Sequence, residues 1–497
     1  MQALKAPFLP ALLGLAGMSL PAMALDILPS VELTEIYTDN VDLQPDGQKE
    51  HEWVTRVAPN LRLEHAGPGL AVDVDYTLES LFYAEDSDRN EVYNQLASSA
   101  VLDVLGRSLQ LVAAAEIEQI NLSPERAVAS SNVNSTGNRG DQRMFSIGPQ
   151  WRRSVFGSSV LDGHVTAARI DFSADEAMAQ DVDAAYGRVA LHSDLDLWRP
   201  VISYELAYEY HRFDYEISDE VIVQNSYLEL AYNLSDGFAL LGLAGLDSDI
   251  EDLRSRSMSE SRWEAGFRAA IGNSRVRATM GHRYFGTSYA FEWENTQPDA
   301  GYRLSYEETP VTTELSSLER IGIPAVPGEM PAPLPPDGAL SRPGAAVRYV
   351  LKRGDAAIDR RLFRTAVRLA LFVEDREDQV MQGAGGTLGT ALHNERAYGG
   401  LLHLQWEAGA RATVAFDGNW THRRVNDLAG CMPGGGTSCD LQRYTDKLTN
   451  LRLDLDYQLG IRTTLTAGLG WLDRNGSLLV DYDEFYARIQ LAHAFRL

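Results

Sequence analysis

Apolar and polar residues alternate along much of the chain with a period of two. In residues 70–78, LAVDVDYTL, the apolar and aromatic side chains point one way and Asp73, Asp75 and Thr77 point the other. Residues 202–210, 451–459 and 485–497 follow the same pattern. One apolar and one charged face is typical of a half-buried β-strand, so a soluble sandwich would also produce it. Several segments, however, exceed the usual ~5–6 residues and approach the ~9–11 residues of a tilted membrane strand.

The connections between these segments alternate between tight and long, which favours a membrane barrel with short turns at one end and long loops at the other. The tight ones are expected at 65–69, 105–107, 155–159, 197–200, 234–237, 271–274, 352–357, 407–411 and 458–462. The long ones are expected at 42–52, 84–91, 121–140, 173–182, 247–258, 310–343, 374–392, 426–442 and 473–480. A connection near residue 286 breaks the rhythm because it is short where a long one is due.

This spacing predicts an all-β fold, a single antiparallel transmembrane barrel of about 22 strands within a range of about 18 to 24. An even count places both chain termini in the periplasm. A barrel of this size has a lumen too wide for side chains to fill. No separate plug domain is expected before the first strand, so loops or inward side chains would have to narrow the lumen. The Pro-rich loop at 310–343 could fold into the mouth, although its composition favours an extended surface loop.

The first 24 residues read as a secretory signal peptide. Lys5 supplies the positive charge, residues 8–20 form a short apolar core, and residues 22–24 form an A-x-A cleavage site. The predicted domains are therefore the signal at 1–24 and an outer-membrane barrel at 25–497. After residue 24 no stretch approaches the ~20 apolar residues of a spanning helix.

The net charge of -26 argues against a nucleic-acid partner, because phosphates would be repelled. It suits an outer-membrane surface whose loop carboxylates share divalent cations with lipid and lipopolysaccharide, although solubility alone would also account for it. The two cysteines, Cys431 and Cys439, flank a short Gly-rich segment and predict a disulfide.

The face of each strand opposite the apolar one is the best place to look for function, because charged residues that line a lumen tune selectivity. The polar requirement of any lumen would explain most of these charges as well. By alternation, the predicted lumen-lining residues are Asp73, Asp75, Glu205, Glu209, Glu229, Arg364, Arg368, Arg452, Asp454, Asp456, Arg488 and Arg496.

Motifs of catalysis or of cofactor and metal binding are not found in the sequence. The ten histidines are scattered, and the chain has no H-E-x-x-H motif, nucleophile elbow or P-loop. We therefore expect no enzyme activity, no catalytic residues, no cofactor and no metal site.

Several strings resemble the outer-membrane barrels associated with the PEP-CTERM protein-sorting and exopolysaccharide systems of Gram-negative bacteria. They are EIYTDNV (35–41), LFYAEDSDRN (81–90), NLSP (121–124), STGNRGDQRMFSIGP (135–149) and GHRYFGTSY (281–289). The resemblance implies an outer-membrane barrel that acts with exopolysaccharide export and its periplasmic components, and it carries over no catalytic or ligand residue. The chain ends in Leu497, whereas the assembly signal of such barrels usually ends in an aromatic residue.

Three functions follow as hypotheses. The first is a pore for exopolysaccharide export, the second a general or solute-selective porin, and the third a closed barrel that serves as a scaffold for a polysaccharide or protein-sorting system. An outer-membrane enzyme is a distant fourth.

Overall fold

The computed structural model describes residues 25–106, 108–173, 179–193, 201–216, 220–251, 258–312, 348–378, 393–427, 442–477 and 481–495. Its strands are β1 (Asp26–Thr38), β2 (Glu52–Gly67), β3 (Leu70–Tyr83), β4 (Glu91–Asp103), β5 (Leu109–Asn121), β6 (Arg139–Val155), β7 (Ser159–Phe172), β8 (Val182–Ser193), β9 (Ile202–Tyr215), β10 (Val221–Ser235), β11 (Phe238–Glu251), β12 (Met258–Ile271), β13 (Ser274–Arg283), β14 (Gly286–Gln297), β15 (Ala300–Thr312), β16 (Arg348–Leu362), β17 (Thr365–Asp378), β18 (His393–Glu407), β19 (Ala412–Asp427), β20 (Gln442–Gln458), β21 (Thr463–Gly476) and β22 (Tyr482–Ala494). A one-turn 3-10 helix, Ser87–Arg89, lies between β3 and β4. In the described part of the chain, no helix is long and apolar enough to cross a membrane.

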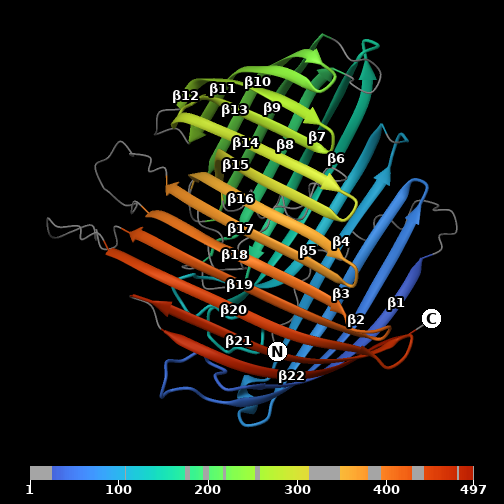
Figure 1. The fold of residues 1–497 in the computed structure, drawn as a ribbon, viewed down its shortest axis with the longest axis vertical. Coiled ribbons are helices and arrows are strands. Elements are labelled where there is room, and N and C mark those ends of the chain that lie inside the picture. The colour runs from blue at the N-terminus through green and yellow to red at the C-terminus, as the bar shows by residue number, and fades with distance from the viewer. Residues whose placement is uncertain are drawn as a thin grey trace.

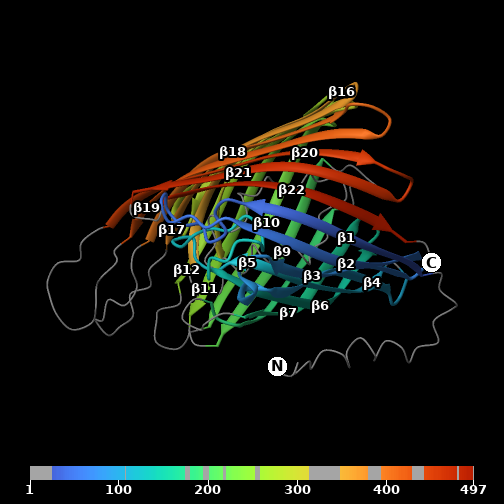
Figure 2. The same ribbon diagram turned by 90° about the horizontal axis from the view of Figure 1, so that it is seen from below.

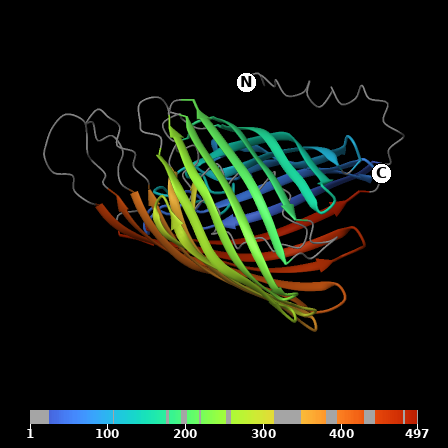
Figure 3. The ribbon, with the colours of Figure 1, turned by 90° about the horizontal axis from the view of Figure 1, so that it is seen from above.

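The strands form one closed antiparallel barrel. Each strand pairs with the next along the chain, and β1 closes the ring by pairing with β22 over residues 30–38 and 486–494. In Figure 1 the yellow-to-red strands lie in front of the blue-to-green ones, and Figures 2 and 3 show both walls tilted around a common space. Closure leaves no unpaired strand edge. The predicted all-β barrel with 22 strands is confirmed.

Short turns gather at one end of the barrel, together with the start of β1 and the end of β22. We call this the turn end and the opposite end the loop end. Connections of two residues join β2 to β3, β10 to β11, β12 to β13, β14 to β15 and β16 to β17. Gly69 and Gly272 take positive φ angles of 93° and 59° in these turns, a conformation that glycine adopts without steric cost. At the loop end, the predicted exception is present, because only two residues join β13 to β14.

The turn expected at 352–357 is wrong. These residues lie inside β16, and the real turn comes at 363–364, where Phe363 has a φ of 56°. A Cβ on Gly354 would lie 3.0 Å from Cγ1 of Val373 and 3.5 Å from Cδ2 of Tyr306. The glycine therefore sits in a strand beneath neighbouring side chains, not in a bend. The Pro-rich loop also begins later than expected, because β15 continues to Thr312.

The outer surface carries an apolar band between two rows of aromatic side chains. On β18, Tyr398 and Trp406 face outward near the loop end and the turn end, with Leu402 and Leu404 between them. Eight residues at ~3.4 Å span about 27 Å along the strand, or about 21 Å along the barrel axis for a tilt of ~40°. The same two rows contain Trp53, Phe82, Trp263, Tyr289, Trp420 and Trp471 toward the loop end, and Tyr232, Phe238, Phe267 and Tyr457 toward the turn end.

Candidate functional site in the barrel lumen

The lumen is too wide for inward side chains alone to fill. With 22 strands spaced ~4.8 Å apart and tilted by ~40°, the circumference is about 140 Å and the diameter about 44 Å between backbones. Inward side chains extend only several ångströms from each wall. Any narrowing near the centre therefore requires a segment of chain inside the barrel.

Such a segment is the β5–β6 connection, residues 122–138, which we call the inner loop. Asparagine side chains at its two ends hydrogen-bond to its backbone. Asn138 donates through Nδ2 to the carbonyls of Ser123 (2.8 Å) and Ala127 (2.9 Å), and its Oδ1 accepts from the Ser123 backbone N–H (2.9 Å). Asn121 makes a similar pair of bonds to the backbone of Ala129, at 2.9 and 3.1 Å. These bonds satisfy backbone groups that would otherwise be buried without partners.

Two buried arginines of the opposite wall hold the first half of the inner loop. Arg474 on β21 donates to the carbonyl of Pro124 at 2.6 Å and to that of Arg126, and it forms a bidentate pair with Asp446 at 2.8 and 2.9 Å. Arg423 on β19 donates to Oε1 of Glu125 at 3.2 Å. Hydrogen bonds from charged donors are stronger than neutral ones, so these arginines stabilise the position of the loop against β19 and β21.

The middle and the second half of the inner loop are held by β22 and β3. The hydroxyl of Tyr482 accepts from the Val128 N–H and donates to its carbonyl, both at 3.0 Å. Asn134 donates to Oε1 of the buried Glu484 at 2.8 Å. On the near wall, the hydroxyl of Tyr83 donates to the carbonyl of Val133 at 2.8 Å. The loop is therefore attached on both sides of the lumen.

Apolar contacts accompany these bonds. Val128 and Ala129 belong to a buried cluster that includes Leu43 from the β1–β2 loop and side chains of β17, β18, β20, β21 and β22. Val133 belongs to a second buried cluster with residues of β1, β2 and β3. Burial of a valine side chain contributes about 1.5–3 kcal/mol, so the clusters add to the attachment of the loop.

The inner loop covers one part of the barrel cross-section. A 17-residue segment that goes out and returns reaches at most about 29 Å, which exceeds half of the estimated diameter. Its hydrogen bonds extend from β3 through β22 to β19, and none of those described reaches β7–β16. In Figure 2 the cyan trace of this segment lies between the strand walls, near the end away from the label C. The lumen is therefore narrowed asymmetrically.

The predicted lumen residues of β9 and β10 lie on the inward face and are paired with arginines. Glu205 accepts from Arg188 at 2.6 Å and from the hydroxyl of Tyr227 at 2.8 Å, and Glu209 lies 3.4 Å from the same arginine. Glu229 accepts from Arg277 at 2.5 Å. These pairs place fixed charges of both signs along the wall that the inner loop leaves uncovered.

One network joins three of the predicted residues of β20 and β22. Asp454 accepts from Arg452 at 2.5 Å and from Arg488 at 2.8 Å. Asp456 accepts from the hydroxyl of Thr466 at 2.6 Å. Elsewhere, Arg368 pairs with Asp359 at 2.5 Å. Arg364 lies in the turn between β16 and β17, and Arg496, Cys431 and Cys439 lie outside the described residues.

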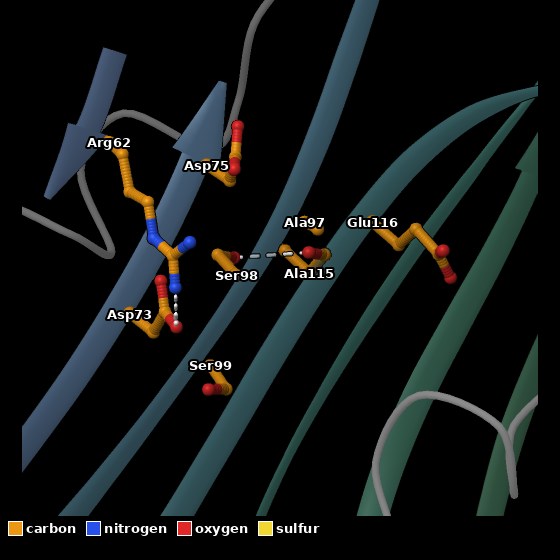
Figure 4. Close-up of a pocket in the computed structure, with 8 residues that line it drawn as sticks. All are labelled: Arg62, Asp73, Asp75, Ala97, Ser98, Ser99, Ala115 and Glu116. Atoms are coloured by element: carbon orange, nitrogen blue, oxygen red, sulfur yellow. Dashed lines mark hydrogen bonds and ion pairs between the residues drawn. The ribbon is translucent and has the colours of Figure 1, made fainter. Parts of the chain in front are cut away.

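Asp73 and Asp75 line a hollow in the lumen wall. This hollow has a volume of about 390 Å³ and is bordered by Arg62, Ala97, Ser98, Ser99, Ala115 and Glu116. Figure 4 shows Arg62 joined to Asp73, with Glu116 on the far side. A second hollow of about 300 Å³ shares Asp75 and Glu116 and is also lined by Asn132 of the inner loop. Together they form a polar groove that runs along the wall to the loop.

Sequence reasoning missed the inner loop and its anchors. Residues 121–140 read as one more outer loop, and nothing in the local pattern of β19 or β21 marks Arg423 or Arg474 as buried. A usable signal was the composition of 127–138, which combines an apolar start, three asparagines and no charged residue. Among the described residues, no group of three or more His, Cys, Asp or Glu side chains is arranged to hold a metal ion.

The comparisons with known proteins show the fold alone. No family model and no curated protein matches the chain. Among solved structures, it is similar to the FrpB iron transporter from Neisseria meningitidis. The F3-3 variant matches with a TM-score of 0.52 and 10% identity over 94% of this chain and 82% of that one. The apoprotein form of the F5-1 variant matches with a TM-score of 0.51 and 9% identity over 94% and 81%.

Proposed function

We propose that this protein is a transport pore of the bacterial outer membrane. The apolar outer band supports the location, because its height of about 21 Å approaches the ~25 Å band of outer-membrane barrels and aromatic rows border it on both sides. Short turns then face the periplasm and long loops face outward. The barrel fold is shared with the FrpB iron transporter, which is named as a transport protein.

The observation that carries the transport proposal is the inner loop. A wide barrel with a polar lumen conducts unless it is filled, and here one anchored segment fills only part of the cross-section. The uncovered wall carries paired charges such as Arg188 with Glu205, which interact with hydrated polar solutes.

We further propose that the cargo is a polysaccharide handled by a PEP-CTERM-associated export system. The short strings that resemble that family support this assignment, and the polar groove lined by Asp73 and Asp75 offers hydrogen-bond partners for sugar hydroxyls. The similarity to the FrpB iron transporter shows the fold and does not extend to its cargo, because the two chains are only 10% identical.

A solute-selective porin is the second candidate. The narrowing by the inner loop favours it, since a fixed obstruction admits small hydrated solutes more easily than a growing polymer. The porin would need no periplasmic partner.

Conductance in a planar bilayer tests these functions. The refolded mature chain is expected to give a steady conductance that the host's own exopolysaccharide blocks. A conductance that stays the same when the polymer is added would support the porin instead. If a folded and inserted barrel carried no current, the transport proposal would be wrong and a scaffold would be the better assignment.

A further inference from the structure

A concentrated group of basic side chains lies on the outward face of three adjacent strands. Its members are Arg396 on β18, His422 and Arg424 on β19, and Arg443 and Lys447 on β20, and we call it the basic patch. Strand register places them side by side: Arg396 is opposite Arg424, Lys447 is opposite His422, and Arg443 lies two positions before Thr445, the partner of Arg424. These residues share the face of the exposed Tyr398 and Trp420, and the residues between them on each strand are buried.

This arrangement is unfavourable without an anionic partner. Like charges directly opposite each other on a sheet repel, as Arg396 and Arg424 do. Arg396 has one carboxylate partner, Asp375, but within the described residues Arg424, Arg443 and Lys447 form no ion pair. In a chain with a net charge of -26, five basic side chains on one outward surface are a local exception, and in the described part of the chain only Arg396 among them forms an ion pair.

The patch also has a concave centre. A hollow of about 380 Å³ is lined by Arg424, Asn426, Arg443, Tyr444, Thr445 and Ser477. Two guanidinium groups with hydroxyl and amide donors around one hollow match the oxygens of a phosphate group, because guanidinium binds phosphate with two parallel hydrogen bonds.

The position of the patch relative to the aromatic row indicates which molecule would supply that phosphate. His422 and Arg424 lie two and four residues beyond Trp420, which is about 5 and 10 Å above the aromatic row for a strand tilt of ~40°. Headgroups occupy about 5–7 Å outside the hydrocarbon core. Long basic side chains at this level reach the headgroups of the outward leaflet.

From these observations we infer that the basic patch binds the phosphate groups of lipid A, the membrane anchor of lipopolysaccharide. The inference rests on the proposed outer-membrane location and goes beyond the pore function, since the patch lies outside the lumen. It would fix one lipid against β18–β20 and thereby neutralise basic side chains of the patch.

Lipid binding to the purified mature chain in neutral detergent tests the inference, with native mass spectrometry to count bound lipid. The probe is lipid A with both phosphates, compared with lipid A from which the phosphates have been removed. The double variant Arg424→Gln/Arg443→Gln should bind the phosphorylated probe roughly 25-fold more weakly, since each basic residue near an anionic lipid surface contributes about fivefold. The charge-conserving variant Arg424→Lys/Arg443→Lys should retain part of the affinity.

The matched control is Arg169→Gln/Arg212→Gln, which removes two outward arginines that already pair with carboxylates. It should leave binding unchanged. Equal binding by the wild type and the Arg424→Gln/Arg443→Gln variant would overturn the inference, as would equal binding of the dephosphorylated probe. Cell fractionation is scored separately, so a failure of the outer-membrane location is distinguishable from a failure of lipid binding.

Discussion

Release of the inner loop is the prediction that follows most directly from the described contacts. Arg474 is only 1% exposed and joins Asp446 to the carbonyls of Pro124 and Arg126. Replacing arginine alone would leave the Asp446 carboxylate buried without a partner, which destabilises proteins strongly. The informative variant is therefore Arg474→Met/Asp446→Asn, which removes both charges together.

The expected magnitude comes from the two bonds to the loop. A hydrogen bond from a charged group contributes about 1.5–3 kcal/mol, so the variant loses about 3–6 kcal/mol of docking free energy. Each 1.4 kcal/mol is tenfold, so the released fraction should rise about 100-fold or more. Trypsin cleavage after Arg126 measures that fraction, because proteolysis tracks the open population when reclosing is faster than cleavage.

A matched variant distinguishes release of the inner loop from the general destabilisation that follows the loss of any buried ion pair. Arg283→Met/Asp247→Asn removes a bidentate pair with bonds of 2.9 and 3.2 Å that is equally buried but bonds to no part of the inner loop. Mass spectrometry should detect the new peptide end at Arg126 only in the first variant. Equal cleavage rates in the wild type and both variants would refute the claim that Arg474 anchors the loop.

Two further predictions concern the outward apolar band and the β1–β2 loop. Leu453→Arg places a charge in the outward apolar band and should cost about 2–4 kcal/mol of unfolding free energy in lipid vesicles, whereas Leu459→Arg in a turn should cost almost nothing; equal costs would contradict the proposed membrane band. Burial raises the pKa of Asp42 in the β1–β2 loop, although Arg89 acts to lower it. The folded state therefore favours the protonated carboxyl, so this contribution to stability is complete below the unfolded pKa of 3.8 and is lost as the pH rises above it. Hydrogen exchange of that loop should accelerate over this range in the wild type and not in Asp42→Asn, and an identical pH dependence in both would contradict the assignment.

The barrel could be predicted from sequence because its main determinant is local. Alternation with a period of two separates the two faces of each strand, and turn and loop lengths count the strands. The misplaced turn at 352–357 shows the limit of this reasoning, because a Gly-Asp pair looks the same in a turn and in a strand where Tyr306 covers the glycine. The bonds that position the inner loop are not local at all. Arg474 and Pro124 are 350 residues apart, and only the closed ring brings them together.

The inward positions illustrate the same division. Alternation assigned Glu205, Glu209 and Asp454 to one face, but it could not show that each would be neutralised by an arginine from another strand. Arg364 was placed by counting from a strand that in fact begins one residue later. The charge balance of a lumen depends on register between strands, which a single sequence does not contain.

Conductance with and without the inner loop tests the central claim most directly. In the variant to be measured, residues 124–136 are replaced by a short Gly-Ser linker, and the single-channel current in a planar bilayer is compared with that of the wild type at the same salt concentration. We predict a larger conductance in the variant, because a segment that can reach at most about 29 Å into a lumen about 44 Å wide is removed. An unchanged conductance from a folded barrel would show that the inner loop does not narrow the path.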